Sequence, residues 1–250
     1  GGSVLVPDGR VVFVPANASN VGVFNPMTGL FSGIAVPALG TALAGRFAGA
    51  VLVPSGNVIF VPQNSANVGV YNPLTTGYSN VGPVAGQGLN LFAGGALAPN
   101  GNVVFAPYNS ANVGLFNPTL QTYTNVGPIA AQGLGLFTGA VLVPSGNVVF
   151  VPANGSNVGM FNPVLQTYTN VGPVAVGQTA QWSGGVLAPN GNVVFVPYNS
   201  ANVGVFNPGL SLASPSPMPA GAWSNAYPTG AGSGFASGGT LLPSGNVIFA

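Results

Sequence analysis

The chain contains almost no side chain that could take part in acid–base, nucleophilic or metal chemistry. It has no histidine and no cysteine, and its only charged side chains are those of Asp8, Arg10 and Arg46. A Ser–His–Asp triad therefore lacks its histidine, a glycosidase pair lacks its second carboxylate, and zinc lacks its usual ligands. A calcium site would have to rely on carbonyl groups and one carboxylate. These absences predict that the chain is not an enzyme and that it holds no metal and no cofactor.

Neutral groups that could bind a ligand recur at fixed intervals. Asparagine and glutamine amides hydrogen-bond to hydroxyl pairs, and an aromatic ring can stack on a sugar, so a ring of equivalent loops would form a multivalent face for glycans or partner proteins. The candidate residues for this face are Asn64, Asn67, Asn109, Asn112, Asn154, Asn199, Gln87, Gln132, Gln178, Phe92, Phe137 and Trp182. The alternative interpretation is that the aromatic side chains fill the seams between repeats and that the asparagines cap loop backbone groups.

These residues belong to a repeat of about 45 residues that occurs five times in full and a sixth time in part. One proline tracks the unit, and it recurs as Pro7, Pro54, Pro99, Pro144, Pro189 and Pro243. Self-similarity at this period predicts a repeat architecture. Glycine and proline stand at fixed positions of the unit, which is typical of turns and not of disorder.

Each unit reads as four short strands. In the second unit an apolar run at 51–53 leads through a Pro-Ser-Gly-Asn turn into a β-branched run at 57–61, which predicts a hairpin. A third strand at 68–71 ends at an Asn-Pro turn, and a fourth follows at 78–83. The fourth strand carries a proline in three units, Pro83, Pro128 and Pro173. Because proline donates no ladder hydrogen bond, this strand is predicted to be the outer edge.

The fold predicted from this pattern is all-β, a β-propeller of four-stranded antiparallel blades with five full blades and a partial sixth. A β-solenoid and a linear array of hairpins are the alternatives. The predicted single propeller covers 1–250, with blades at about 1–46, 47–91, 92–136, 137–181 and 182–237 and the partial blade at 238–250. Both ends fall within a repeat phrase, so the chain is expected to be a fragment of a longer one.

The phrase PNGNVVFVPYNSANVGVFNP, Pro189 to Pro208, resembles the blades of YVTN-type and related NHL- or kelch-like propellers. It also resembles repeat segments of bacteriophage virion proteins such as tail fibres and spikes. The resemblance covers the whole chain and implies a propeller. Such blades usually carry aspartate before the third-turn proline, whereas this chain has Asn25, Asn72, Asn117, Asn162 and Asn207.

The low charge and the short apolar segments argue against two further classes of function, nucleic-acid binding and membrane insertion. A net charge of +1 offers no basic stripe for nucleic acid. No apolar run approaches the ~20 residues of a spanning helix, and strands of about five residues are too short for a membrane barrel. So few ionisable groups also predict a stability that is nearly constant from acid to neutral pH.

The resulting hypothesis is a structural and binding propeller in a phage virion appendage, with other virion proteins or further copies of itself as partners and a virion or extracellular location. The alternatives are a secreted or cell-surface lectin-like module that binds glycans, and a surface-layer or filament component. The last repeat interval is stretched by the segment from Gly209 to Gly239, so Trp223 and Tyr227 are predicted to protrude and to contact another protein.

Overall fold

The computed structural model describes residues 2–36, 44–84, 89–129, 133–174, 180–209, 223–228, 234, 236 and 238–249. These residues form five four-stranded antiparallel sheets and one two-stranded hairpin, and no helix is found among them. The predicted fold class, an all-β propeller with four-stranded blades, is confirmed. The hairpin corresponds to the inner half of the predicted sixth blade.

The blades follow one another along the chain, and the strands run from the inside of each blade to its outside. Blade 1 contains β1 (Ser3–Leu5), β2 (Val11–Phe13), β3 (Asn20–Asn25) and β4 (Leu30–Ala35); blade 2 contains β5 (Phe47–Leu52), β6 (Val58–Pro62), β7 (Val68–Asn72) and β8 (Gly77–Val81). Blade 3 contains β9 (Phe92–Leu97), β10 (Val103–Pro107), β11 (Val113–Asn117) and β12 (Thr122–Val126); blade 4 contains β13 (Phe137–Leu142), β14 (Val148–Pro152), β15 (Asn157–Asn162) and β16 (Thr167–Pro173). Blade 5 contains β17 (Trp182–Leu187), β18 (Val193–Pro197), β19 (Asn202–Phe206) and β20 (Trp223–Pro228), and β21 (Gly239–Leu241) pairs with β22 (Val247–Phe249).

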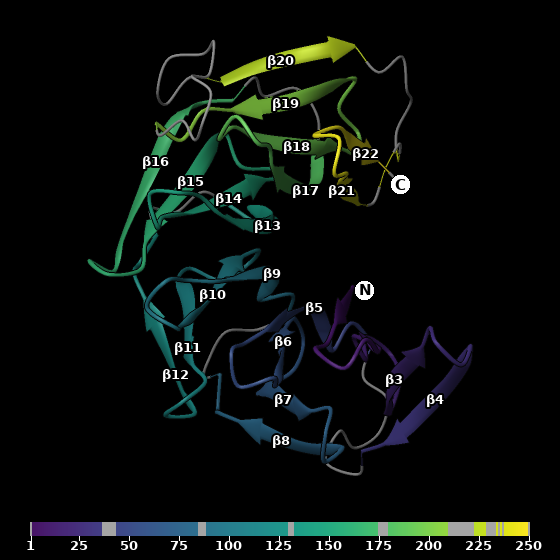
Figure 1. Ribbon diagram of the computed structural model, residues 1–250. Coiled ribbons are helices and arrows are strands. Elements are labelled where there is room, and N and C mark those ends of the chain that lie inside the picture. The colour runs from purple at the N-terminus through teal and green to yellow at the C-terminus, as the bar shows by residue number, and fades with distance from the viewer. Residues whose placement is uncertain are drawn as a thin grey trace.

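The blades are arranged around a common centre in an open arc, with β5, β9, β13 and β17 on the inside and β8, β12, β16 and β20 on the rim (Figure 1). The strand marked by proline is therefore the outer edge, as predicted. Pro83 and Pro128 lie just beyond the last residues of β8 and β12, and Pro173 ends β16.

Hydrogen bonds within the turns, and a glycine with positive φ, stabilise the hairpins. In the turn between β5 and β6, the amide of Val53 donates to the oxygen of Asn57 at 3.0 Å, and the amide of Gly56 donates to Val53 at 2.9 Å. Gly56 has a φ of 83°, a conformation that favours glycine. In the turn between β7 and β8, the Oδ1 atom of Asn72 accepts from the amides of Leu74 and Thr75. The first of these turns recurs in the other blades, and the second recurs in blades 3 and 4.

Two unlike faces of each blade form the core. We call the "valine face" the side of blade 2 that carries Ile59, Val61 and Val70, with the equivalent positions of the other blades. The "aromatic face" is the opposite side, which carries Phe60 and Tyr71 in blade 2. Each of the four apolar clusters joins the valine face of one blade to the aromatic face of the next blade. Burial of these side chains is the main force that holds the blades together.

The first strand of blades 2 to 5 begins about four residues earlier than the sequence predicted. Phe47, Phe92, Phe137 and Trp182 are the first residues of β5, β9, β13 and β17 and do not lie in a loop. The run FAGAVL holds three small residues with little β preference of their own, and it becomes a strand because it pairs with β6.

Candidate functional site

Asparagines of the predicted binding face link neighbouring blades through side-chain hydrogen bonds. The Nδ2 atom of Asn109 donates to the oxygen of Leu89 at 3.2 Å, and its Oδ1 atom accepts from the amide of Gly135 at 2.9 Å. Leu89 lies in the segment that enters blade 3, and Gly135 lies in the segment that enters blade 4. Both hydrogen-bonding groups of this amide are thus used within the protein.

The same connection repeats around the arc. The equivalent side chains are Asn64, bonded to Ala44 and Asn90; Asn154, bonded to Leu134 and Ala180; and Asn199, which accepts from the amide of Gly234. The second set, Asn67 and Asn112, is held through the backbone by the hydroxyls of Ser65 and Ser110, which bridge the amide and the carbonyl of each asparagine. The side chains of the first set therefore cap loop backbone groups, as in the alternative interpretation, whereas in the second set serine hydroxyls cap the backbone of the asparagines.

The aromatic residues of the predicted face cannot stack on a ligand, and this part of the prediction is wrong. Phe92, Phe137 and Trp182 are 0–1% exposed. Their rings pack at 5.5–5.8 Å from the ring of the second-strand phenylalanine of the same blade. They lie inside because each is the first residue of an inner strand, with its side chain on the buried aromatic face.

The other predicted residues have different outcomes. Gln87, Gln132 and Gln178 lie outside the described residues. Trp223 and Tyr227 belong to β20, the outer strand of blade 5, and so do not lie in a protruding loop. Trp223 pairs with Phe206 as Tyr123 pairs with Phe116 in blade 3. Their contact with another chain stays a prediction.

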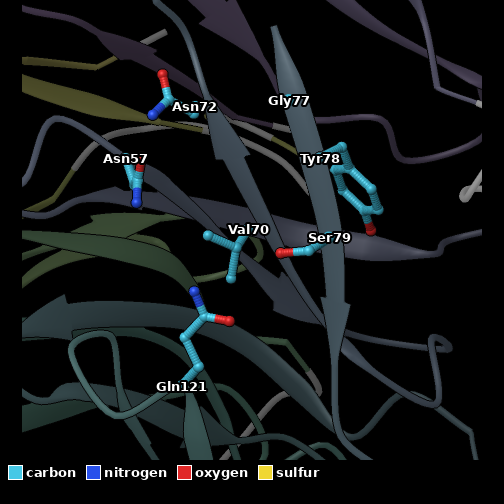
Figure 2. Close-up of a pocket in the computed structure, with 7 residues that line it drawn as sticks. All are labelled: Asn57, Val70, Asn72, Gly77, Tyr78, Ser79 and Gln121. Carbon is cyan, nitrogen blue, oxygen red and sulfur yellow. The ribbon is translucent and has the colours of Figure 1, made fainter. Parts of the chain in front are cut away.

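A pocket of about 300 Å³ lies near the rim of the arc, where the outer half of blade 2 meets the turn between β11 and β12 of blade 3. It is lined by Asn57, Val70, Asn72, Gly77, Tyr78, Ser79 and Gln121. Figure 2 shows Gln121 extending from blade 3 toward Val70 and Ser79, with the Asn57 and Asn72 amides beyond them, while the Tyr78 ring points away from this group. None of these seven residues is charged.

Small side chains open the pocket at this junction. Val70 occupies the position that Leu115 and Met160 hold in blades 3 and 4. Two further positions follow the same rule: Gly77 stands where those blades have Thr122 and Thr167, and Ser79 stands where they have Thr124 and Thr169. These residues were not predicted from the sequence, because the prediction followed what the repeats share and not the size of the side chain at each repeat position.

The pocket offers hydrogen-bonding groups of both kinds. The Oδ1 atom of Asn57 is buried and accepts no hydrogen bond from the described residues. The Oδ1 atom of Asn72 is used by its turn, which leaves its Nδ2 atom as a donor. Burial raises the pKa of Tyr78 well above its ordinary value, and its hydroxyl donates to Asn80 at 2.8 Å, so this side chain is neutral at physiological pH.

Two other kinds of site were sought in the described part of the chain. No group of three or more acidic, histidine or cysteine side chains that could hold a metal ion is found there. None of its elements is a helix long and apolar enough to cross a membrane.

Solved structures with similar folds are numerous, but no family model and no curated protein matches the sequence. Virginiamycin B lyase from Staphylococcus aureus matches with a TM-score of 0.68 at 14% identity, covering 87% of this chain and 70% of the lyase. The extracellular domain of a putative hybrid two-component system from B. thetaiotaomicron matches with a TM-score of 0.68 at 12% identity, covering 100% and 32%. An auxiliary nutrient binding protein from Bacteroides ovatus matches with a TM-score of 0.58 at 14% identity, covering 84% and 55%. At these identities the similarity shows the fold alone.

The lyase structures correct the prediction that the chain is not an enzyme. They show that this fold carries catalysis, so missing residue types exclude particular mechanisms and not enzymatic activity as a class. One of the similar structures is a catalytically inactive lyase in which a histidine is replaced by alanine, bound to quinupristin. This chain has no histidine, so that residue has no counterpart here.

Proposed function

We propose that the chain is a ligand-binding propeller of an extracellular protein and that its ligand is a neutral, hydroxyl-rich molecule such as a glycan. The observation that carries the proposal is the uncharged pocket between blades 2 and 3. Its volume of about 300 Å³ is at the lower end of the range for ligand sites, which suits one terminal sugar residue.

The lining matches hydroxyl groups better than ions. The side-chain amide of Gln121 and the Nδ2 atom of Asn72 can hydrogen-bond to sugar hydroxyls. An anion or a cation would find no opposite charge in this pocket, since none of its lining residues is ionised.

One of the similar structures supports the extracellular part of the proposal, and another supports the binding part. One is described as an extracellular domain and another as an auxiliary nutrient binding protein, and both share the fold with this chain. A role in a phage tail fibre, spike or head decoration rests on the sequence resemblance, and the similar structures named above are not virion proteins. The glycan-binding alternative is therefore the function that we put forward.

The test is a saccharide panel titrated into the protein by calorimetry, with a pocket-filling variant as the comparison. Val70→Leu, Gly77→Thr and Ser79→Thr together give blade 2 the side chains that blade 3 has at these positions, so the variant should fold. We expect at least one neutral saccharide to bind the native protein and to bind the triple variant at least tenfold more weakly. Equal binding to both proteins, or no binding by any neutral saccharide, would exclude this pocket as a glycan site.

A further inference from the structure

The pocket between blades 2 and 3 places one carboxamide beside one apolar side chain. Val70 lies on β7 and Ser79 lies on β8, and the side chain of Gln121 extends toward both from the turn between β11 and β12 (Figure 2). The side-chain amide of Gln121 has no hydrogen-bond partner among the described residues. Its donor and its acceptor are therefore both available to a ligand.

The turn that carries Gln121 is held by hydrogen bonds. The Oδ1 atom of Asn117 accepts from the amide of Thr119 at 3.0 Å and from the amide of Leu120 at 2.9 Å. Gln121 itself has a φ of 51°, in the left-handed region, and the same place in blade 1 is held by a glycine, Gly29. These constraints fix the direction in which the side chain of Gln121 leaves the backbone, which suits it to oriented hydrogen bonds.

The opposite wall of the pocket lies on the valine face of blade 2. In the register of β7 and β8, Val70 stands opposite Ser79 and Asn72 stands opposite Gly77. Directly paired residues share one face of a sheet, so the Val70 methyl groups, the Ser79 hydroxyl and the Asn72 amide border a common surface. Gly77 adds no side chain to it. This wall is therefore apolar at Val70 and polar at the two neighbouring positions.

An acetamido group matches this arrangement better than a hydroxyl does. A hydroxyl placed against the Val70 methyl groups would lose hydrogen bonds to water without gaining a replacement. The methyl of an acetamido group can pack on Val70 instead, while its N–H and its carbonyl pair with the amide of Gln121. The acetamido group is uncharged, as are all the residues that line the pocket.

Given the glycan-binding function proposed above, on which this step rests, we propose that the pocket selects sugars that carry an N-acetyl group, such as N-acetylglucosamine or N-acetylgalactosamine. Gln121 distinguishes the acetamido group from a hydroxyl, and Val70 holds its methyl. The Nδ2 atom of Asn72 remains as a donor for a ring hydroxyl. The corresponding free amino sugar is a cation at neutral pH, and it would find no carboxylate in this pocket.

The test compares sugars that differ only in the group at carbon 2. N-acetylglucosamine, glucose and glucosamine form one series, and the three corresponding galactose compounds form the other. In calorimetry at neutral pH, the acetamido sugar of at least one series should bind at least tenfold more tightly than the other two members, because only it uses both groups of the Gln121 amide. Saturation-transfer NMR should show the strongest contact at the acetyl methyl.

The variants identify the residue that makes the distinction. Gln121→Glu keeps the length of the side chain but removes its N–H donors, so it should weaken binding of the acetamido sugar at least tenfold. Gln166→Glu is the matched control, because Gln166 has a φ of 53° in the equivalent turn of blade 4, which faces the larger side chains of blade 3. It should bind like the native protein, and circular dichroism should show that both variants fold.

The outcomes separate this selectivity from the function on which it rests. Equal binding of the acetamido sugars and their parent sugars would overturn the selectivity, and glycan binding would stand if the triple variant that fills the pocket weakens both. No binding by any of the sugars would overturn both proposals. Unchanged binding by Gln121→Glu, or an equal loss in Gln166→Glu, would also overturn the role of Gln121.

Discussion

The free energy of unfolding should fall steeply at alkaline pH, because the blades bury tyrosine hydroxyls and burial disfavours the charged tyrosinate form. Tyr78, Tyr123 and Tyr168 occupy the same position in blades 2, 3 and 4, and burial raises the pKa of each hydroxyl well above its ordinary value of about 10. Each hydroxyl also donates to an asparagine two residues further along the strand. The folded protein therefore keeps three protons that the unfolded chain releases above pH 10.

The sign and the size follow from this difference in bound protons. A folded-state pKa above the unfolded-state value stabilises fully below pH 10, and this stabilisation is lost as the pH rises toward the folded-state pKa. Each proton that the folded protein keeps and the unfolded chain has fully released lowers the free energy of unfolding by about 1.4 kcal/mol per pH unit. The unfolded tyrosines are about half deprotonated at pH 10 and mostly deprotonated at pH 11, so each contributes about 1 kcal/mol over this interval. Three tyrosines should thus lower the free energy of unfolding by roughly 3 kcal/mol, a large part of the ~5–15 kcal/mol of a typical domain.

The acid side should behave differently. The side-chain hydrogen bond from Arg10 lowers the pKa of Asp8, so this pair stabilises above the ordinary pKa of aspartate and is lost as the pH falls below it. The pair lies at the surface, where such contacts contribute little. Stability should therefore stay nearly constant from about pH 4 to pH 9.

The assay is denaturant unfolding followed by circular dichroism at pH 5, 7, 9, 10 and 11, with Tyr123→Phe as the comparison. Phenylalanine keeps the ring and removes one titrating proton, so the loss between pH 10 and pH 11 should shrink by about one third. An unchanged midpoint at pH 11 would refute the reasoning about buried tyrosines. A fall of several kcal/mol between pH 7 and pH 5 would reveal a coupled ionisable site that the described residues do not show.

Three further predictions concern packing, the asparagine ties and proteolysis. Gly185→Ala places a methyl group 2.8 Å from a buried valine methyl and should destabilise the protein by about 1–3 kcal/mol in thermal unfolding, whereas Gly184→Ala, with open space around it, should change stability by only a few tenths; equal effects would contradict the packing of blades 4 and 5. Asn109→Ala removes two hydrogen bonds between loops and should cost about 1–3 kcal/mol, and a neutral result would show that water replaces the amide without cost. Trypsin should leave the folded protein uncut at Arg46, which is 4% exposed, and should release a fragment that begins at residue 47 only after unfolding; rapid cleavage there at neutral pH would show that the segment between blades 1 and 2 opens.

The blades were predictable from the sequence because their signals are local. A proline, a glycine with positive φ and a β-branched run follow one another within ten residues, and this order specifies a hairpin before any tertiary contact is known. The early start of β5 was not predictable, since Ala48 and Gly49 have no strand preference and take their conformation from pairing with β6.

The candidate site was harder to predict, because it depends on contacts between repeats. Asn64 looked available as a ligand-binding amide, yet its two hydrogen-bonding groups are used by the segments that enter blades 2 and 3. The pocket arises from a difference in side-chain volume at Val70, Gly77 and Ser79. That difference gains meaning only once the turn of the next blade, with Gln121, is known to lie opposite these positions.

The central claim is that the small side chains of blade 2 create a site for a neutral sugar, and counting binding sites tests it most directly. A reciprocal variant, Leu115→Val with Thr122→Gly and Thr124→Ser, gives blade 3 the small side chains of blade 2 and faces Gln166 of blade 4 in place of Gln121. With the best saccharide of the panel, calorimetry should give one site for the native protein, none for the filled blade 2 variant and two for the reciprocal variant. A stoichiometry that is the same in all three proteins would contradict the claim.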